Sequence, residues 1–179
     1  ITTKRAVERV ERAPSHVRVA ATITPQHLLV NRNDMLGRGG IRPHLYCMPI
    51  LKTADDQNQL IVAATSGNPR FFLGTDTAPH AVGDKECACG CAGVFSAHAA
   101  LELYAMAFDS IGHGLVERLP DFAGRFGREF YELDPKGRTI TLQREDWIPP
   151  VSYDFGDAQV VPFNPGLKDD VPLTWKMVA

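Results

Sequence analysis

The chain has 179 residues, of which 44% are hydrophobic and 22% charged, and its formal net charge is −2. This composition is typical of a globular domain with a buried core, and the scattered Lys and Arg residues provide no basic field for a nucleic-acid partner. No apolar run approaches the length of a membrane span, and the first residues lack the apolar core of a signal peptide, so we expect a cytoplasmic protein without a membrane partner.

Helices and strands are predicted to alternate in the first part of the chain. Apolar residues at helical spacing predict a helix over Lys4–Arg12, and Ala54–Ala64 is predicted to be a longer helix with acidic residues in its first turn, where the helix dipole favours anions. The strand-like runs are Val17–Thr24, Arg42–Met48 and Arg70–Thr75. This alternation predicts parallel strands, buried on both faces, with helices as crossovers.

Two more helical stretches follow. Ser96 can cap a helix that carries Leu101 and Phe108 on one apolar side. The second stretch spans Gly114–Phe126, and we expect Pro120 to start or kink its core portion.

The character of the chain changes from about Pro135. A short β-like segment, Arg138–Leu142, is followed by recurring prolines, which indicates an extended wrap and not another βα unit. We therefore divide the chain into residues 1–134, which carry the βα units, and residues 135–179, an extension that packs on them. A complete eight-stranded barrel normally needs about 200 residues or more. The fold is thus either a smaller open sheet or part of something larger.

The four cysteines are concentrated in one loop, since only Cys47 lies outside Cys87–Cys91. Bridging cysteines two residues apart would close a small, strained ring, so we expect no structural disulfide. A zinc site built from these thiols is one interpretation. Small reduced residues in a tight loop are the alternative that we favour, because structural zinc sites usually have wider spacing and a second ligand pair.

Two potential metal ligands follow predicted strands. Asp76 comes where a buried strand meets solvent, and a carboxylate there can bind a metal and transfer a proton; a simple turn residue is equally compatible with the sequence. His27 ends another run, and His80 could be a ligand, bind an anionic substrate or lie at the surface. The segment Arg38–Gly40 lacks the context of a phosphate loop. We interpret the remaining histidines as structural: His16, His44, His98 and His113.

The chain carries five motifs in a fixed order: Ala21–Leu28, Asn31–Asn33, Arg42–Cys47, Leu73–His80 and Lys85–Gly93. These motifs and their order resemble those of the bacterial-type (class II) dihydroorotases, a family of the amidohydrolase superfamily. The resemblance extends from Ile1 to about Trp175.

The resemblance implies an α/β fold, namely the C-terminal half of a (β/α)8 TIM barrel with a C-terminal extension. It also implies a hydrolase of pyrimidine biosynthesis that reversibly cyclises N-carbamoyl-L-aspartate to L-dihydroorotate and acts as a homodimer. The implied cofactor is a pair of Zn²⁺ ions bridged by a carboxylated lysine outside this chain.

The resemblance also implies a role for individual residues. His27 matches a ligand of the second zinc, and Asp76 matches a ligand of the first zinc that is the general base in ring opening and the general acid in closure. Main-chain groups of Met48 and Ala92, with the side chain of His80, match groups that hold the substrate, and His80 and Ala92 meet its carboxylate.

The chain departs from the family pattern in two respects. The other ligands, including a histidine directly before the Ile-Thr-Thr stretch, would lie upstream of Ile1, and Val94 stands where the family often has a further cysteine. Two alternatives stay open. A hydantoinase-like cyclic-amide hydrolase is disfavoured by the Cys89–Gly93 loop. A catalytically silent scaffold that binds a partner enzyme is disfavoured by the intact His27, Asp76 and His80.

Overall fold

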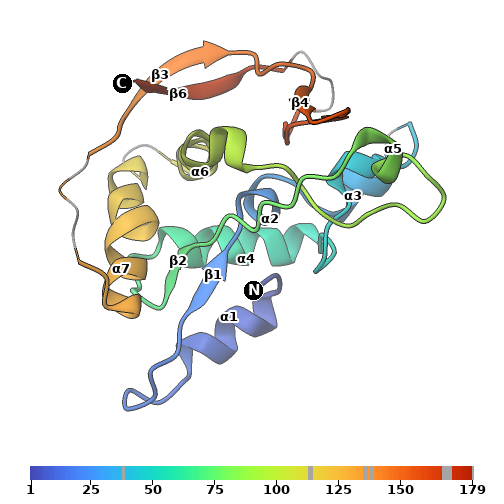
Figure 1. Cartoon of the computed structure of the whole chain (residues 1–179). Helices are drawn as coiled ribbons and strands as arrows, with labels where there is room; N and C mark the ends of the chain where they lie inside the picture. Colours follow the sequence, from blue (N-terminus) through green and yellow to red (C-terminus); the bar gives the residue numbers. More distant parts are fainter. Residues whose placement is uncertain (38, 113–114, 135–136, 138, 167–170, 179) are drawn as a thin grey trace.

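The computed structural model describes residues 1–37, 39–112, 115–134, 137, 139–166 and 171–178 (Figure 1). Five residues that enter the sequence-based predictions lie outside these ranges: Arg38, His113, Gly114, Pro135 and Arg138.

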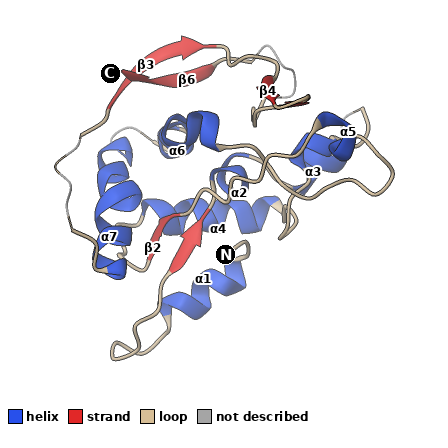
Figure 2. Ribbon diagram, in the orientation of Figure 1, coloured by secondary structure: helices blue, strands red, loops and turns tan. Residues whose placement is uncertain are grey.

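Two parallel strands form the centre of the first part (Figure 2). Strand β1 (Ala21–Ile23) pairs with β2 (Phe71–Leu73), and the helix α4 (Ala54–Thr65) lies between them in sequence. Helix α1 (Lys4–Glu11) precedes β1 and packs on α4. The predicted parallel pair and both helices are confirmed, although each strand is shorter than the apolar run that predicted it.

The predicted strand over Arg42–Met48 is wrong. This segment contains one turn of 3-10 helix, η1 (Pro43–Leu45), in which the N–H of Tyr46 donates to the carbonyl of Pro43 at 3.0 Å. Proline has no N–H to donate to a strand ladder; Pro43 lies within this segment and Pro49 directly follows it. The chain therefore turns where a third strand was expected.

Short helices follow the two strands. After β1 come α2 (Pro25–Leu29) and α3 (Arg32–Leu36), and α5 (Val82–Lys85) follows β2. Pro25 occupies the first turn of α2, where its missing N–H costs nothing. His27, expected at the end of an extended run, therefore lies on a helix.

The helix predicted after Ser96 begins later than expected. A 3-10 turn, η2 (Ala97–Ala99), leads into α6 (Ala100–Asp109), and the hydroxyl of Ser96 donates to the carbonyl of Thr75 at 3.1 Å instead of capping a helix. The capping prediction is wrong, because the Ser96 oxygen accepts no hydrogen bond from the N–H groups that follow it and its side chain is directed at Thr75.

Three helical segments follow α6 within the described residues: η3 (Leu115–Arg118), a π-helical turn η4 (Asp121–Arg125) and α7 (Phe126–Tyr131). Pro120 directly precedes η4, which confirms its predicted place at the start of the core portion. The core is aromatic here, since the ring of Phe122 lies 5.4 Å from that of Tyr104 and 5.2 Å from that of Phe108.

The last part forms antiparallel strands that lie across α6 (Figure 1). Strand β3 (Thr141–Trp147) pairs with β6 (Leu173–Val178), and β4 (Tyr153–Phe155) forms a hairpin with β5 (Ala158–Val160). The β-like character was predicted, but the first strand is longer and begins later. The β3–β6 pair forms an antiparallel ribbon. It is anchored to α6 by the N–H of Met177, which donates to the Glu102 carboxylate at 3.2 Å.

Candidate functional site

The carboxyl ends of β1 and β2 open into a cavity of about 380 Å³. Parallel sheets present their ligand sites at this edge, so the position itself points to chemistry. Residues from the start of the chain, both strand ends and α2 form the walls: Ile1, Thr2, Thr22, Thr24, His27, Pro49, Gly74 and Asp76.

His27 is almost completely buried in the wall of this cavity, at 3% exposure. Its Nδ1 lies 2.7 Å from the hydroxyl of Thr24, and its Nε2 lies 2.9 Å from the carbonyl of Pro49. The Pro49 carbonyl can only accept, so Nε2 carries the proton and Nδ1 keeps its lone pair. Burial lowers the pKa of His27, and the ring is therefore neutral near pH 7.

Asp76 stands at the opposite strand end in an unusual backbone conformation. Its φ is +46°, in the left-handed region that aspartate tolerates better than most residues, and its side chain is exposed. Gly74 allows the two strand ends to approach, because a Cβ on it would lie 2.5 Å from the Cβ of Thr22. The close approach brings the carboxylate of Asp76 and the imidazole of His27 to one cavity.

His80 and Ala92 also lie side by side. The Nε2 of His80 is 3.2 Å from the carbonyl of Ala92, and the N–H of Ala78 donates to the carbonyl of Val94 at 2.9 Å. A Cβ on Gly93 would lie 2.4 Å from the carbonyl oxygen of Ala78, so only glycine permits this contact. The structure thus brings together two of the residues that were expected to bind a carboxylate.

Met48 is exposed, at 63%, and it precedes Pro49, whose carbonyl contacts His27. Among the described residues that line the 380 Å³ cavity, Met48, His80 and Ala92 do not occur. The structure therefore brings His27 and Asp76 to one cavity and places the expected substrate-binding groups outside its walls.

Lys85 was not singled out from the sequence, yet it organises the neighbouring loop. Its side chain is 4% exposed, and Nζ donates to three carbonyls: Tyr46 at 2.8 Å, Cys91 at 2.8 Å and Gly93 at 2.6 Å. Burial lowers the pKa of Lys85. The three hydrogen bonds fasten the loop of Ala92 to the η1 turn. Every residue has a backbone carbonyl, so the sequence gives no signal that these three carbonyls accept from Lys85.

Two of the histidines interpreted as structural make contacts within the fold. Nε2 of His44 lies 2.9 Å from the carboxylate of Glu86, and Nε2 of His98 lies 2.9 Å from the carbonyl of Phe163. His16 is exposed. Burial lowers the pKa of His98.

The donor types in the cavity suit zinc. Zinc accepts imidazole nitrogen and carboxylate oxygen, and a ligating histidine usually donates its other N–H to a carbonyl, as His27 does to Pro49. Within the part of the chain that the structure describes, no three His, Cys, Asp or Glu side chains gather in a metal-binding arrangement. His27 and Asp76 fit as two ligands of a site that needs further donors.

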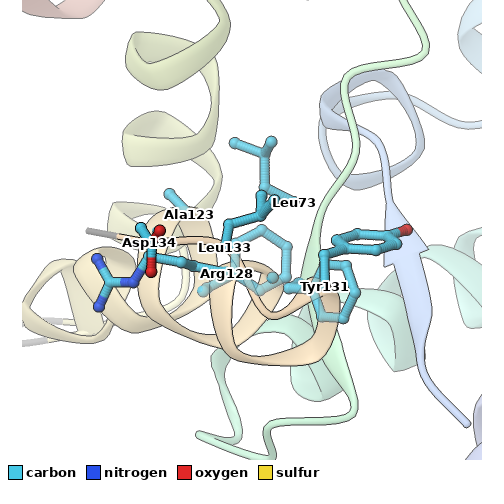
Figure 3. A pocket seen from close by; sticks show the side chains of 10 residues that line it. Leu73, Ala123, Arg128, Tyr131, Leu133 and Asp134 are labelled. Atoms are coloured by element: carbon cyan, nitrogen blue, oxygen red, sulfur yellow. The ribbon is translucent and has the colours of Figure 1, made fainter. Parts of the chain in front are cut away.

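A second cavity, of about 620 Å³, lies beside β2 and α7 and has a different character (Figure 3). Its walls are mainly carbon, with Arg128 and Asp134 as the charged residues that contribute to them. It offers an apolar surface and not a cluster of reactive groups. The other lining residues are Phe72, Leu73, Phe122, Ala123, Gly124, Gly127, Tyr131 and Leu133.

None of the described helices is long and apolar enough to cross a membrane.

Curated relatives match almost the whole chain. A dihydroorotase of Teredinibacter turnerae is 56% identical over 177 residues, which are 99% of this chain and 49% of that protein. A dihydroorotase of Acinetobacter baumannii is 56% identical over 161 residues, or 89% of this chain and 45% of that protein. The chain thus spans about half the length of the curated relatives that it matches. No family model matches the chain.

Solved structures agree in fold. The crystal structure of Saccharomyces cerevisiae dihydroorotase in complex with 5-fluoroorotic acid has a TM-score of 0.86 and 30% identity, and the match covers 99% of this chain and 50% of that one. The Campylobacter jejuni dihydroorotase structure has a TM-score of 0.81 and 31% identity, and the match covers 100% and 49%. The similarity in sequence and in fold identifies the chain as a relative of the dihydroorotases that spans about half of their length.

Proposed function

We propose that the chain forms the C-terminal half of a zinc-dependent dihydroorotase, which interconverts N-carbamoyl-L-aspartate and L-dihydroorotate. The observation that carries this proposal is the 56% identity over 99% of the chain. The cavity at the strand ends supports it, because His27 and Asp76 lie at the edge of the sheet where parallel folds place their chemistry. A relative of known structure binds 5-fluoroorotic acid, which fits a pyrimidine-like substrate.

The architecture that we propose is half of a (β/α)8 barrel in residues 1–134, with residues 135–179 as an extension on its outside. Three observations support it. The strands β1 and β2 are parallel, α4 lies between them in sequence, and an apolar cavity lies beside β2, where further barrel elements would pack.

Zinc ions, as Zn²⁺, would be held by His27 and Asp76 together with a carboxylated lysine and histidines from outside this chain. When bound, such ions polarise the amide carbonyl of the substrate. The nitrogen of Ile1 lies 2.8 Å from the carbonyl of Thr22, and Ile1 lines the cavity.

The side chains of this chain would move the proton and hold the substrate. In ring opening, Asp76 takes a proton from the attacking water and delivers it to the ring nitrogen as the C–N bond breaks. In closure it takes a proton from the attacking nitrogen as the C–N bond forms and delivers it to the oxygen that leaves as water. An exposed carboxylate beside a cavity can reach both positions.

His80 and Ala92 would bind the substrate carboxylate, with a main-chain group of Met48 as a further contact. His80 and Ala92 are already adjacent, since Nε2 of His80 lies 3.2 Å from the Ala92 carbonyl; the group of Ala92 that can donate to an anion is its N–H. A homodimer in the cytoplasm is a further prediction from the family resemblance. We predict neither nucleic acid nor membrane as a partner.

The proposal is tested by assaying the full-length protein that contains this chain in both directions of the reaction, with hydantoin and dihydrouracil as competing substrates. We expect turnover of L-dihydroorotate and N-carbamoyl-L-aspartate that is lost on chelation and returns with zinc. Preferential hydrolysis of hydantoin would establish the hydantoinase-like alternative. No turnover of any cyclic amide by zinc-loaded protein would establish the silent scaffold.

A further inference from the structure

The loop between α5 and η2 displays two thiols to solvent at short range. Cys87 and Cys89 are both exposed, and their sulfur atoms are 3.2 Å apart. Cys91 is half-buried, and Cys47 is buried in the fold. The four cysteines therefore fall into one exposed pair and two thiols that solvent reaches less easily.

The fold of the loop holds this pair together. The N–H of Gly90 donates to the carbonyl of Cys87 at 3.1 Å, and the N–H of Cys91 donates to the carbonyl of Asp84 at 2.9 Å. Gly90 has a φ of +46°, which glycine adopts without strain. Lys85 binds the carbonyl of Cys91 from the buried side. Hydrogen bonds within the turn and from Lys85 thus hold the backbone around Cys89 in place.

The electrostatics of the pair favour reaction at one sulfur. The hydrogen bond from Cys89 lowers the pKa of Cys87 and raises the pKa of Cys89, so Cys87 is the better source of thiolate. Burial raises the pKa of Cys47 to about 11, which keeps that thiol protonated and unreactive. An accessible thiolate beside a second thiol is the arrangement that reversible thiol oxidation requires.

We propose that Cys87 and Cys89 form a modification site at which low-molecular-weight disulfides, such as glutathione disulfide, reversibly form an intrachain disulfide. The Cys87 thiolate attacks one sulfur of the reagent, which forms a mixed disulfide and releases one thiolate. Cys89 then loses its proton and attacks Cys87, which forms the Cys87–Cys89 bond and releases the second thiolate. Two electrons pass from the protein to the reagent.

The ring that this bond closes is small and strained, and a strained, exposed disulfide is easily reduced. The site would therefore exchange with the thiol pool and would not act as a permanent crosslink. Since it lies outside the walls of the His27 and Asp76 cavity, it stands whether or not the proposed activity is correct.

The test is to equilibrate the full-length protein with mixtures of reduced glutathione and glutathione disulfide, quench with N-ethylmaleimide, and map the tryptic peptide 86–118 by mass spectrometry. This peptide contains Cys87, Cys89 and Cys91. We expect oxidising mixtures to remove two of its three alkylatable thiols with a mass loss of two hydrogens, and dithiothreitol to restore both. Cys91→Ser is the matched control and should keep the full response.

Cys87→Ser and Cys89→Ser should each abolish the two-hydrogen loss and leave at most a glutathione adduct. An equal disulfide yield in Cys87→Ser would place the bond between Cys89 and Cys91 and overturn the assignment. Retention of all three thiols in oxidising mixtures, or arrest of the wild type at the glutathione adduct, would also overturn it. The variants change exposed side chains, so circular dichroism and the Cys91→Ser control separate misfolding from loss of the site.

Discussion

Individual side chains position the two strand ends that carry the candidate site. The hydroxyl of Tyr104, which is fully buried, lies 2.7 Å from the carbonyl of Ile23 and 3.2 Å from that of Gly74. It therefore links the end of β1 to the end of β2. Gly74 adds the close approach to Thr22, so a tyrosine and a glycine hold together the strand ends that lead to His27 and Asp76.

Asp76→Asn should lower the rates of ring opening and ring closure in the full-length enzyme by at least about 100-fold, because an amide cannot carry the proton. Both rates are measured by steady-state assays at saturating zinc. The matched control is Asp55→Asn, which removes an exposed carboxylate on α4 that pairs with Lys4 at 3.6 Å. Near-normal turnover of Asp76→Asn would contradict the proposed role.

His80→Ala should raise KM for N-carbamoyl-L-aspartate while the bound zinc stays at the wild-type level. The physical reason is that the proposed role of His80 is to meet the substrate carboxylate, and its ring lies against the Ala92 carbonyl. Metal analysis and kinetics on the same preparation check this. His44→Ala, which changes a histidine paired with Glu86, is the control. Loss of zinc from His80→Ala would show that His80 is a ligand.

At the scale of elements, the loop Lys85–Gly93 and the η1 turn form one unit although they are far apart in sequence. Lys85 supplies three hydrogen bonds, and the N–H of Gly93 donates to the carbonyl of Tyr46 at 2.9 Å. Tyr46 accepts from both groups, and its ring lies 5.8 Å from the ammonium of Lys85. The position of Ala92, and with it the proposed anion site, depends on this unit.

Lys85→Met should lower the free energy of unfolding by roughly 2 kcal/mol or more, because the carbonyls of Cys91 and Gly93 would lose their donor, and a buried acceptor without a partner costs about 1–3 kcal/mol. Urea unfolding of the full-length protein, followed by circular dichroism, is the measurement. Lys176→Met, at an exposed ion pair with Glu145, should change the value by less than about 1 kcal/mol. Equal effects of the two substitutions would mean that the Lys85 contacts do not stabilise the loop.

At the scale of the whole molecule, the antiparallel ribbon and the parallel pair are joined through α6. Leu142 and Trp175 of the ribbon pack against the core that contains Tyr104 and Phe108. Away from this ribbon, β2 and α7 line the 620 Å³ apolar cavity (Figure 3). The molecule therefore has one side closed by its own C-terminal strands and another with apolar surface exposed to solvent.

Residues 1–179 expressed alone should bind no stoichiometric zinc pair and show no dihydroorotase activity. A stable catalytic zinc needs about three protein ligands, and the described residues bring only His27 and Asp76 to the cavity. Exposed strand edges and the apolar cavity should also favour association. Metal analysis, an activity assay and light scattering test this, with the full-length protein as control. An active, monomeric preparation of residues 1–179 would contradict the half-barrel proposal.

The sequence by itself determined the elements that depend on local pattern. Apolar spacing and an acidic first turn predicted α4, buried runs predicted β1 and β2, and their order predicted the parallel pairing. Since parallel strands share one functional edge, the same reasoning placed His27, Met48 and Asp76 at that edge, and of these His27 and Asp76 line the cavity while Met48 lies outside its walls.

Only the tertiary structure decided the features that arise between distant segments. It fastened the η1 turn to the Lys85–Gly93 loop, because the Tyr46 carbonyl accepts from both Lys85 and Gly93, and it drew the Ser96 hydroxyl to Thr75 instead of a helix N-terminus. It also brought the sulfurs of Cys87 and Cys89 to 3.2 Å. Periodicity and capping rules describe neighbours along the chain, whereas these contacts join backbone groups and side chains that only packing brings together.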